Sequence, residues 1–241
     1  MNRSLILLIS FLLSISTTGQ AAKSFRIVID PGHGGHDLGA VRDSFIESRI
    51  TLVMAKKLKE QLAVLKLSDT YLTREEDINV SLQDRVTQAE ALQADLFISL
   101  HANTSTSKHW TGMEFYFNTP KPVLKKTADS GNVTNNQVLA QIKEDFKNYA
   151  KSEESLLLTK TIQTETTVST NEKGIIKQAP FFVIENTAMP SVLIELGFLS
   201  NRREAKKLTN PEYQDEIAKR LAQAILQYKE KSDKSVRLEE K

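Results

Sequence analysis

The chain has 241 residues, of which 40% are hydrophobic and 26% are charged, as in an ordinary globular protein. It contains no cysteine, which excludes disulfide-stapled scaffolds and zinc sites built from thiolates. Its 32 basic and 30 acidic residues leave a net charge of +2, which excludes nucleic-acid binding through a broad basic surface.

The N-terminal segment, residues 1–22, is predicted to be a secretory signal peptide. Arg3 precedes an apolar run from Leu5 to Ile15, and small and polar residues follow as far as Ala22. This run is shorter than the roughly 20 residues of a membrane-spanning helix, although an uncleaved N-terminal anchor is the alternative interpretation. We therefore expect an exported protein of the periplasm or the extracellular cell envelope, with no membrane segment after cleavage.

The mature chain alternates short apolar runs with amphipathic helical patterns. The apolar runs predict strands over residues 25–30, 69–72, 95–100, 113–117, 181–184 and 192–196. Apolar residues at helical spacing predict helices over 47–64, 81–92, 137–150, 153–166 and 211–228. This alternation is typical of a single three-layer α/β domain, here residues 23–230, with a mostly parallel sheet flanked by helices. The charged tail at 231–241 is expected to be flexible.

Ionisable side chains follow or interrupt three of the predicted strands. His33 follows the first strand, His101 follows the strand at 95–100, and Glu195 lies within the apolar run at 192–196. Sites in open α/β sheets form beyond the carboxyl ends of the strands, so we expect these side chains to meet. Two imidazoles and a carboxylate form a zinc ligand set, and a second carboxylate can transfer protons. His33, Glu47 and His101 are therefore candidate ligands and Glu195 a candidate catalytic base, with purely structural histidines as the alternative.

The glycine-rich loop after the first strand does not match a nucleotide-binding fingerprint. Gly32 and Gly34 have the spacing of its first two glycines, but the third glycine is absent from the required position. The next helix begins only near Glu47, too far away for its N-terminus to hold a pyrophosphate. Nucleotide binding is therefore excluded.

Four blocks occur in order along nearly all of residues 24–230. They are residues 29–40, 72–85, 97–103 and 192–201, and Glu47 opens the first helix between the first two. These blocks resemble the zinc-dependent N-acetylmuramoyl-L-alanine amidases of bacterial cell walls. The resemblance implies a roughly six-stranded mixed sheet, one zinc ion per chain bound by His33, Glu47 and His101, and Glu195 as the catalytic residue. The implied reaction is hydrolysis of the amide bond between N-acetylmuramic acid and L-alanine in peptidoglycan, for wall remodelling or daughter-cell separation.

Five neighbouring residues are predicted to have supporting roles. His36 is expected at the rim of the site or in a structural role, and His109 on the surface. Asn103 either orients His101, touches substrate or caps its own loop. Arg74 and Arg85 are expected to hold the fold through pairs with carboxylates.

Residues 119–151 resemble the regulatory insert of amidases that split daughter cells. In those relatives a helix covers the zinc cleft until an activator protein displaces it. Two interpretations are open for the helix at 137–150: it covers the cleft, with Glu144 or Asp145 reaching the metal, or it packs on the domain periphery. Residues 173–177 resemble a loop near the cleft, with Glu172 where the family has a basic residue.

Two other functions use the same observations. A non-catalytic envelope scaffold would keep the fold without the reaction, although all four proposed active-site residues are present. A zinc carboxypeptidase would apply the same chemistry to the ends of stem peptides. In each case the protein is expected to be a monomer that recognises its substrate locally in the cleft rather than through bulk charge.

Overall fold

The computed structural model describes residues 24–118, 120, 134–170 and 172–239. The predicted signal peptide therefore lies outside the described residues, as does most of the first half of the insert. Within the described ranges, no helix is long and apolar enough to cross a membrane.

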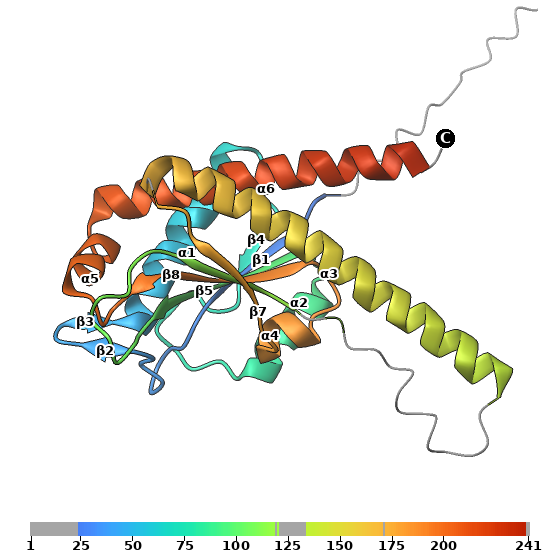
Figure 1. Cartoon of the computed structure of the whole chain (residues 1–241), viewed down its shortest axis with the longest axis horizontal. Helices are drawn as coiled ribbons and strands as arrows, with labels where there is room; N and C mark the ends of the chain where they lie inside the picture. The colour runs from blue at the N-terminus through green and yellow to red at the C-terminus, as the bar shows by residue number, and fades with distance from the viewer. Residues whose placement is uncertain (1–23, 119, 121–133, 171, 240–241) are drawn as a thin grey trace, which may run out of the picture.

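Six strands form one mixed sheet in the order β4-β1-β5-β8-β6-β7 (Figure 1). In chain order they are β1 (Ile27–Pro31), β4 (Thr70–Leu72), β5 (Leu96–Asn103), β6 (Glu114–Phe117), β7 (Ile175–Gln178) and β8 (Ser191–Phe198). Strands β4, β1, β5 and β8 are parallel, whereas β6 is antiparallel to β8 and parallel to β7. A separate ribbon pairs β2 (Val41–Arg42) with β3 (Phe45–Ile46). The predicted fold class, a mostly parallel mixed sheet, is confirmed.

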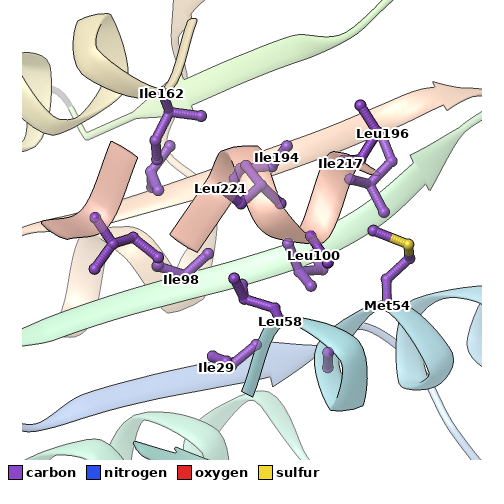
Figure 2. Close-up of a cluster of buried hydrophobic side chains, with 14 of the residues drawn as sticks. Ile29, Met54, Leu58, Ile98, Leu100, Ile162, Ile194, Leu196, Ile217 and Leu221 are labelled. Atoms are coloured by element: carbon purple, nitrogen blue, oxygen red, sulfur yellow. The ribbon is translucent and has the colours of Figure 1, made fainter. Parts of the chain in front are cut away.

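Helices cover both faces of the sheet and give three layers. One face carries α1 (Glu47–Val64), α3 (Asn135–Thr170), α5 (Arg202–Leu208) and α6 (Pro211–Glu239), and the other carries α2 (Leu82–Ala91) and α4 (Phe182–Asn186). Successive side chains of a strand point to opposite faces, so each central strand serves two cores. In β1, Ile29 packs in the larger core with Leu58 and Leu221 (Figure 2), and Val28 packs in the smaller one. Strands buried on both faces explain the continuous apolar runs of the sequence.

Two predicted elements differ at the sheet edge beside α4. Phe181–Ile184 is not a strand: Phe181 is the N-cap of α4, and the other three residues begin that helix. The expected loop at 173–177 instead contains edge strand β7, which pairs with β6. Short apolar runs are compatible with either a strand or a buried helical turn. Strand β7 gives a weak sequence signal because only two of its four residues, Ile175 and Ile176, are apolar.

Two predicted helix boundaries are also wrong. The patterns at 137–150 and 153–166 belong to one continuous helix, α3, because no glycine or proline interrupts it. Helix α6 begins at Pro211 as expected but continues to Glu239 instead of ending at residue 228. Its charged extension contains the i,i+4 pair of Lys229 and Asp233, with nitrogen and oxygen 2.6 Å apart, which favours helix.

The N-terminal half of α3 projects from the domain (Figure 1). No side chain between residues 135 and 150 is buried, and Lys151 is the first buried residue of the helix. The expectation that residues 137–150 cover the cleft is therefore wrong for this conformation. The alternative, a helix packed on the domain periphery, fits only the part of α3 from Lys151 onward.

Lys151 fixes the point at which α3 joins the domain. Its buried Nζ donates to the carbonyl oxygens of Ile184, at 2.8 Å, and of Thr187, both at the end of α4. Burial lowers the pKa of this amine to about 8.

We expect Lys151→Met to lower the free energy of unfolding by about 1–3 kcal/mol, because buried acceptors would lose their donor. Urea unfolding measures this, with Lys160→Met on the exposed face of α3 as control; equal effects of both variants would contradict the assignment.

Candidate metal centre

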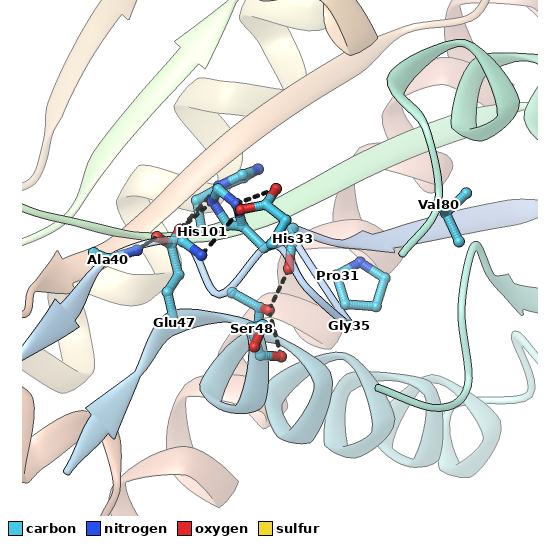
Figure 3. A network of polar contacts seen from close by, with 12 residues as sticks. Pro31, His33, Gly35, Ala40, Glu47, Ser48, Val80 and His101 are labelled. Carbon is cyan, nitrogen blue, oxygen red and sulfur yellow. Dashed lines mark hydrogen bonds and ion pairs between the residues drawn. The ribbon is translucent and has the colours of Figure 1, made fainter. Parts of the chain in front are cut away.

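His33, Glu47 and His101 converge beyond the carboxyl end of β1 (Figure 3). His33 lies in the loop after β1, His101 lies near the end of β5, and Glu47 is the first residue of α1. One potential ligand atom from each residue lies within 4.8 Å of the other two. The structure thus brings together the three residues that the sequence predicts as ligands, at the sheet edge where α/β proteins form their sites.

Glu47 is the centre of this group. Its Oε1 lies 3.0 Å from His101 Nδ1 and 3.2 Å from His33 Nε2. The backbone amides of Ala102 and Ala40 donate to Oε1 and Oε2, at 3.0 and 2.7 Å. Burial alone would raise the pKa of Glu47, but the hydrogen bonds and charges of the two histidines hold that pKa well below its usual range. Glu47 is therefore an ionised carboxylate between two imidazoles.

Asp37 orients the first histidine. Its Oδ2 lies 2.9 Å from His33 Nδ1, so that the other ring nitrogen, Nε2, faces Glu47. A carboxylate on the far nitrogen fixes the tautomer of a metal-binding histidine and makes it a better ligand. The role of Asp37 is not evident from the sequence, in which its position four residues after His33 is a weak signal.

Gly39 allows the loop to close over these side chains. It adopts a φ of +65°, and a Cβ at this position would lie 2.5 Å from Glu47 Oε2 and 2.6 Å from His33 Cδ2. Only glycine combines this backbone conformation with such close contact. The glycine-rich loop therefore serves the histidine and the carboxylate rather than a phosphate.

Glu195 lies beside the candidate ligands on the neighbouring strand. It is paired with His101 across β5 and β8, and it lines a cavity of about 380 Å³ together with His33, Glu47 and His101. Its Oε2 is buried and has no hydrogen-bond partner within the described part of the chain. Burial raises the pKa of Glu195 to about 7, with the two histidines opposing the shift and the charges of Glu47 and Glu114 adding to it. A carboxyl group with such a pKa can both accept and donate a proton near neutral pH.

Glu114 stands opposite Glu195 across β6 and β8. It accepts hydrogen bonds from Lys177 Nζ at 2.6 Å, the Tyr116 hydroxyl at 2.6 Å and Asn103 Nδ2 at 3.1 Å. Asn103 also accepts from the amide of Thr104 at 2.8 Å, so it caps its own loop, and among the described residues it makes no hydrogen bond to the His101 side chain. The sequence does not indicate this cluster, because residues 173–177 resemble a loop, whereas Lys177 lies in β7 and pairs with Tyr116 of β6.

The two arginines have different partners. Arg85 pairs with buried Asp30 at 2.6 Å, as the sequence predicts. Arg74 donates instead to the carbonyl oxygens of Pro31, Gly32 and Ser48, at 3.0, 2.9 and 2.8 Å, so its predicted carboxylate pair is wrong. Both side chains hold the loop that presents His33, whereas His36 and His109 are exposed on the surface.

The family profile described as N-acetylmuramoyl-L-alanine amidase matches residues 27–227. The chain belongs to this amidase family. It is 32% identical over 202 residues to the N-acetylmuramoyl-L-alanine amidase LytC of Bacillus subtilis, a match that covers 84% of this chain and 35% of LytC. This family member thus spans about a third of that curated relative.

Two solved amidase structures resemble this family member. The catalytic domain of CwlV from Bacillus (Paenibacillus) polymyxa var. colistinus is 29% identical, with a TM-score of 0.67, over 86% of this chain and 98% of that one. The CwlD amidase from Clostridioides difficile, solved in complex with the GerS lipoprotein, is 26% identical with a TM-score of 0.60 over 85% and 98% of the two chains. The likeness covers most of this chain and nearly the whole of each solved amidase chain.

The donor set of this family member fits a zinc ion. Two imidazole nitrogens and one carboxylate oxygen match the three protein ligands of catalytic zinc sites, in which a further position stays open. Glu195, whose buried Oε2 has no hydrogen-bond partner among the described residues, lines the same cavity, so a buried carboxyl group accompanies the ligand set.

Zinc binding is expected to depend on pH through His33. Burial lowers the pKa of His33, but contacts with Glu47 and Asp37 outweigh burial and raise that pKa to about 9 in the metal-free protein. Zinc requires the neutral imidazole, so binding below pH 9 displaces one proton, and the apparent affinity should rise about tenfold per pH unit between pH 6 and 8. Competition with a chromophoric chelator measures this; an affinity independent of pH after correction for the chelator's own protonation would contradict it.

Proposed function

We propose that this protein is an exported zinc hydrolase that cleaves the amide bond between N-acetylmuramic acid and L-alanine in peptidoglycan. One observation carries the proposal: in a chain matched by the amidase family over residues 27–227, His33, Glu47 and His101 converge in a cavity that Glu195 also lines. The family match supports the choice of this bond, and the four side chains offer the groups needed to hydrolyse it.

His33, Glu47 and His101 would hold one zinc ion, and Glu195 would be the catalytic residue. When bound, zinc supplies Lewis-acid polarisation of the scissile carbonyl and lowers the pKa of water. Glu195 accepts a proton from the attacking water as the oxygen bonds to the lactyl carbonyl carbon. The same carboxyl group then donates that proton to the L-alanine nitrogen as the carbon–nitrogen bond breaks, so the amine leaves neutral. Asp37 keeps His33 in position, and Lys177 balances the charge of Glu114 beside Glu195.

Mass spectrometry of digested peptidoglycan tests this proposal against its two alternatives. The amidase releases intact peptides that begin with L-alanine and leaves glycan strands without peptides. Release of single C-terminal amino acids would instead identify a carboxypeptidase. If the protein is folded and zinc-loaded but leaves the peptidoglycan sacculi undigested, the non-catalytic scaffold would be favoured.

Export is proposed from the signal-peptide pattern of residues 1–22. The prediction is a mature N-terminus just after Ala21 or Ala22 for protein recovered from the envelope or medium, as read by N-terminal sequencing. If the protein recovered from the envelope still begins with Met1, the uncleaved N-terminal anchor would be supported instead.

A role in daughter-cell separation predicts chained cells in a deletion strain, which measurement of chain length would detect.

The projecting half of α3 is proposed to bind an activator protein. It carries Leu139, Phe146 and Tyr149 at 51%, 71% and 59% exposure, and CwlD was solved in complex with a lipoprotein. Phe146→Ser combined with Tyr149→Ser should cause chaining in cells while purified variant and wild type digest peptidoglycan equally. Normal cell separation by this variant would contradict the proposal.

A further inference from the structure

A second cavity, of about 610 Å³, gathers positive charge that the metal centre does not use. Its cationic lining residues are Arg42, Lys108, Arg202 and Arg203, with His109 and a single carboxylate, Asp43. None of these four cations forms an ion pair with a carboxylate in the part of the chain that the structure describes. The chain as a whole is nearly balanced at +2, so the cavity is a local concentration of positive charge.

The basic cavity adjoins the metal centre along two segments of chain. Ala40 and Thr104 line the cavity of the metal centre, and Arg42 follows Ala40 by only two residues. On the other segment, the amide of Ser105 donates to Ser200 Oγ at 3.1 Å, and Ser200 lines the basic cavity. Two residues of extended chain span about 7 Å, so a peptide of a few residues could reach from one cavity into the other.

The opposite flank of the metal centre has a different character. There, a cavity of about 210 Å³ reaches from His33 and His101 to Val80, Leu82 and Val183, on the side of α2 and α4, and its polar lining residues include Asp30, Asp37, Asn79 and Ser81. Its arginine, Arg85, is already paired with Asp30 at 2.6 Å. The two flanks therefore differ in charge: among the described residues, four cations line the basic cavity beside the β2–β3 ribbon and α5, whereas the opposite cavity is lined by Arg85 together with the carboxylates Asp30 and Asp37.

We propose that the basic cavity binds the carboxylates that the stem peptide carries beyond its L-alanine, so that it sets the direction in which substrate crosses the metal centre. This inference rests on the proposed amidase function. Around the scissile amide, the muramic acid side is uncharged because its lactyl carboxyl is part of the amide, whereas the peptide side carries free carboxylates. Guanidinium groups bind carboxylates with paired hydrogen bonds, which suits a cavity containing three arginines. The neutral sugar then occupies the flank formed by Val80, Leu82 and Val183.

Binding of the free peptide tests the inference without turnover. The probes are a stem tetrapeptide with free carboxylates and the same peptide with its carboxylates amidated. Trp110 is the only tryptophan, is 52% exposed, and lies between the lining residues His109 and Thr111, so its fluorescence reports on the cavity. The wild type should bind the free-carboxylate peptide about tenfold more tightly than the amidated one.

The test variant is Arg42→Gln combined with Arg203→Gln, and the control is Lys206→Gln, an exposed residue of α5 outside the cavity. The double variant should lose the preference for free carboxylates and show a KM raised about tenfold with kcat unchanged, whereas the control should behave as wild type. Equal binding of both peptides by the wild type would overturn the inference even if peptidoglycan is still digested. Cavity-dependent binding of poly(glycerol phosphate) but not of the peptide would assign the cavity to a wall polymer and overturn it too. Failure of the wild type to release L-alanyl peptides would instead refute the proposed function.

Discussion

Glu195→Gln is expected to lower kcat for peptidoglycan hydrolysis about a thousandfold while leaving zinc content unchanged. Glutamine has the size of glutamate but cannot accept the proton of the attacking water. The substitution breaks no hydrogen bond at Oε2, because that buried oxygen has no partner in the described part of the chain. The rate at which L-alanyl peptides appear measures the effect.

The control for this variant is Glu60→Gln, which changes an exposed carboxylate of α1 in the same way. It should retain wild-type kcat. If the Glu195→Gln protein is folded and zinc-loaded but keeps more than about a tenth of the wild-type kcat, a different group must transfer the proton.

Arg85→Met is expected to lower the free energy of unfolding by about 3–5 kcal/mol, because it leaves a buried carboxylate without its cation. Asp30 is 1% exposed, and among the described residues its carboxylate would keep the hydroxyls of Thr73 and Ser99 as hydrogen-bond donors, at 2.6 and 2.8 Å. Arg85 also donates to the carbonyl oxygen of His33 at 2.8 Å, so its loss should weaken zinc binding as well. Chemical denaturation and chelator competition measure the two effects.

A double variant separates the buried charge from the loss of packing. Asp30→Leu combined with Arg85→Met removes both charges, and it should recover part of the stability lost by Arg85→Met alone. Two results would contradict a stabilising interaction between Asp30 and Arg85. The first is a loss of less than about 1 kcal/mol in the free energy of unfolding for Arg85→Met. The second is a double variant whose loss of stability equals the sum of the two single losses.

The sequence predicted the centre of the sheet better than its edge. Strands β1, β5 and β8 are buried on both faces, so their apolar runs identify them directly. Strand β7 has no buried residue, and α4 is a five-residue helix whose end is held by Lys151 from a distant segment. Such tertiary contacts decide between a strand and a helical turn where the local pattern is ambiguous.

The candidate site shows the same division. His33, Glu47, His101 and Glu195 could be predicted because each stands in a recognisable block or directly follows a strand. Asp37 and Glu114 could not, since their roles depend on a loop closing back on itself and on the pairing of β6 with β8. The course of α3 was also missed, because helical periodicity at residues 137–150 does not indicate what the helix packs against.

The zinc content of protein purified without chelators tests the proposed metal centre most directly. Elemental analysis should find about one equivalent in the wild type and in Glu195→Gln, and less than about a tenth of an equivalent in His101→Ala. A zinc-free wild type that still digests peptidoglycan, or a His101→Ala variant that retains a full equivalent, would contradict the assignment of His33, Glu47 and His101 as the zinc ligands.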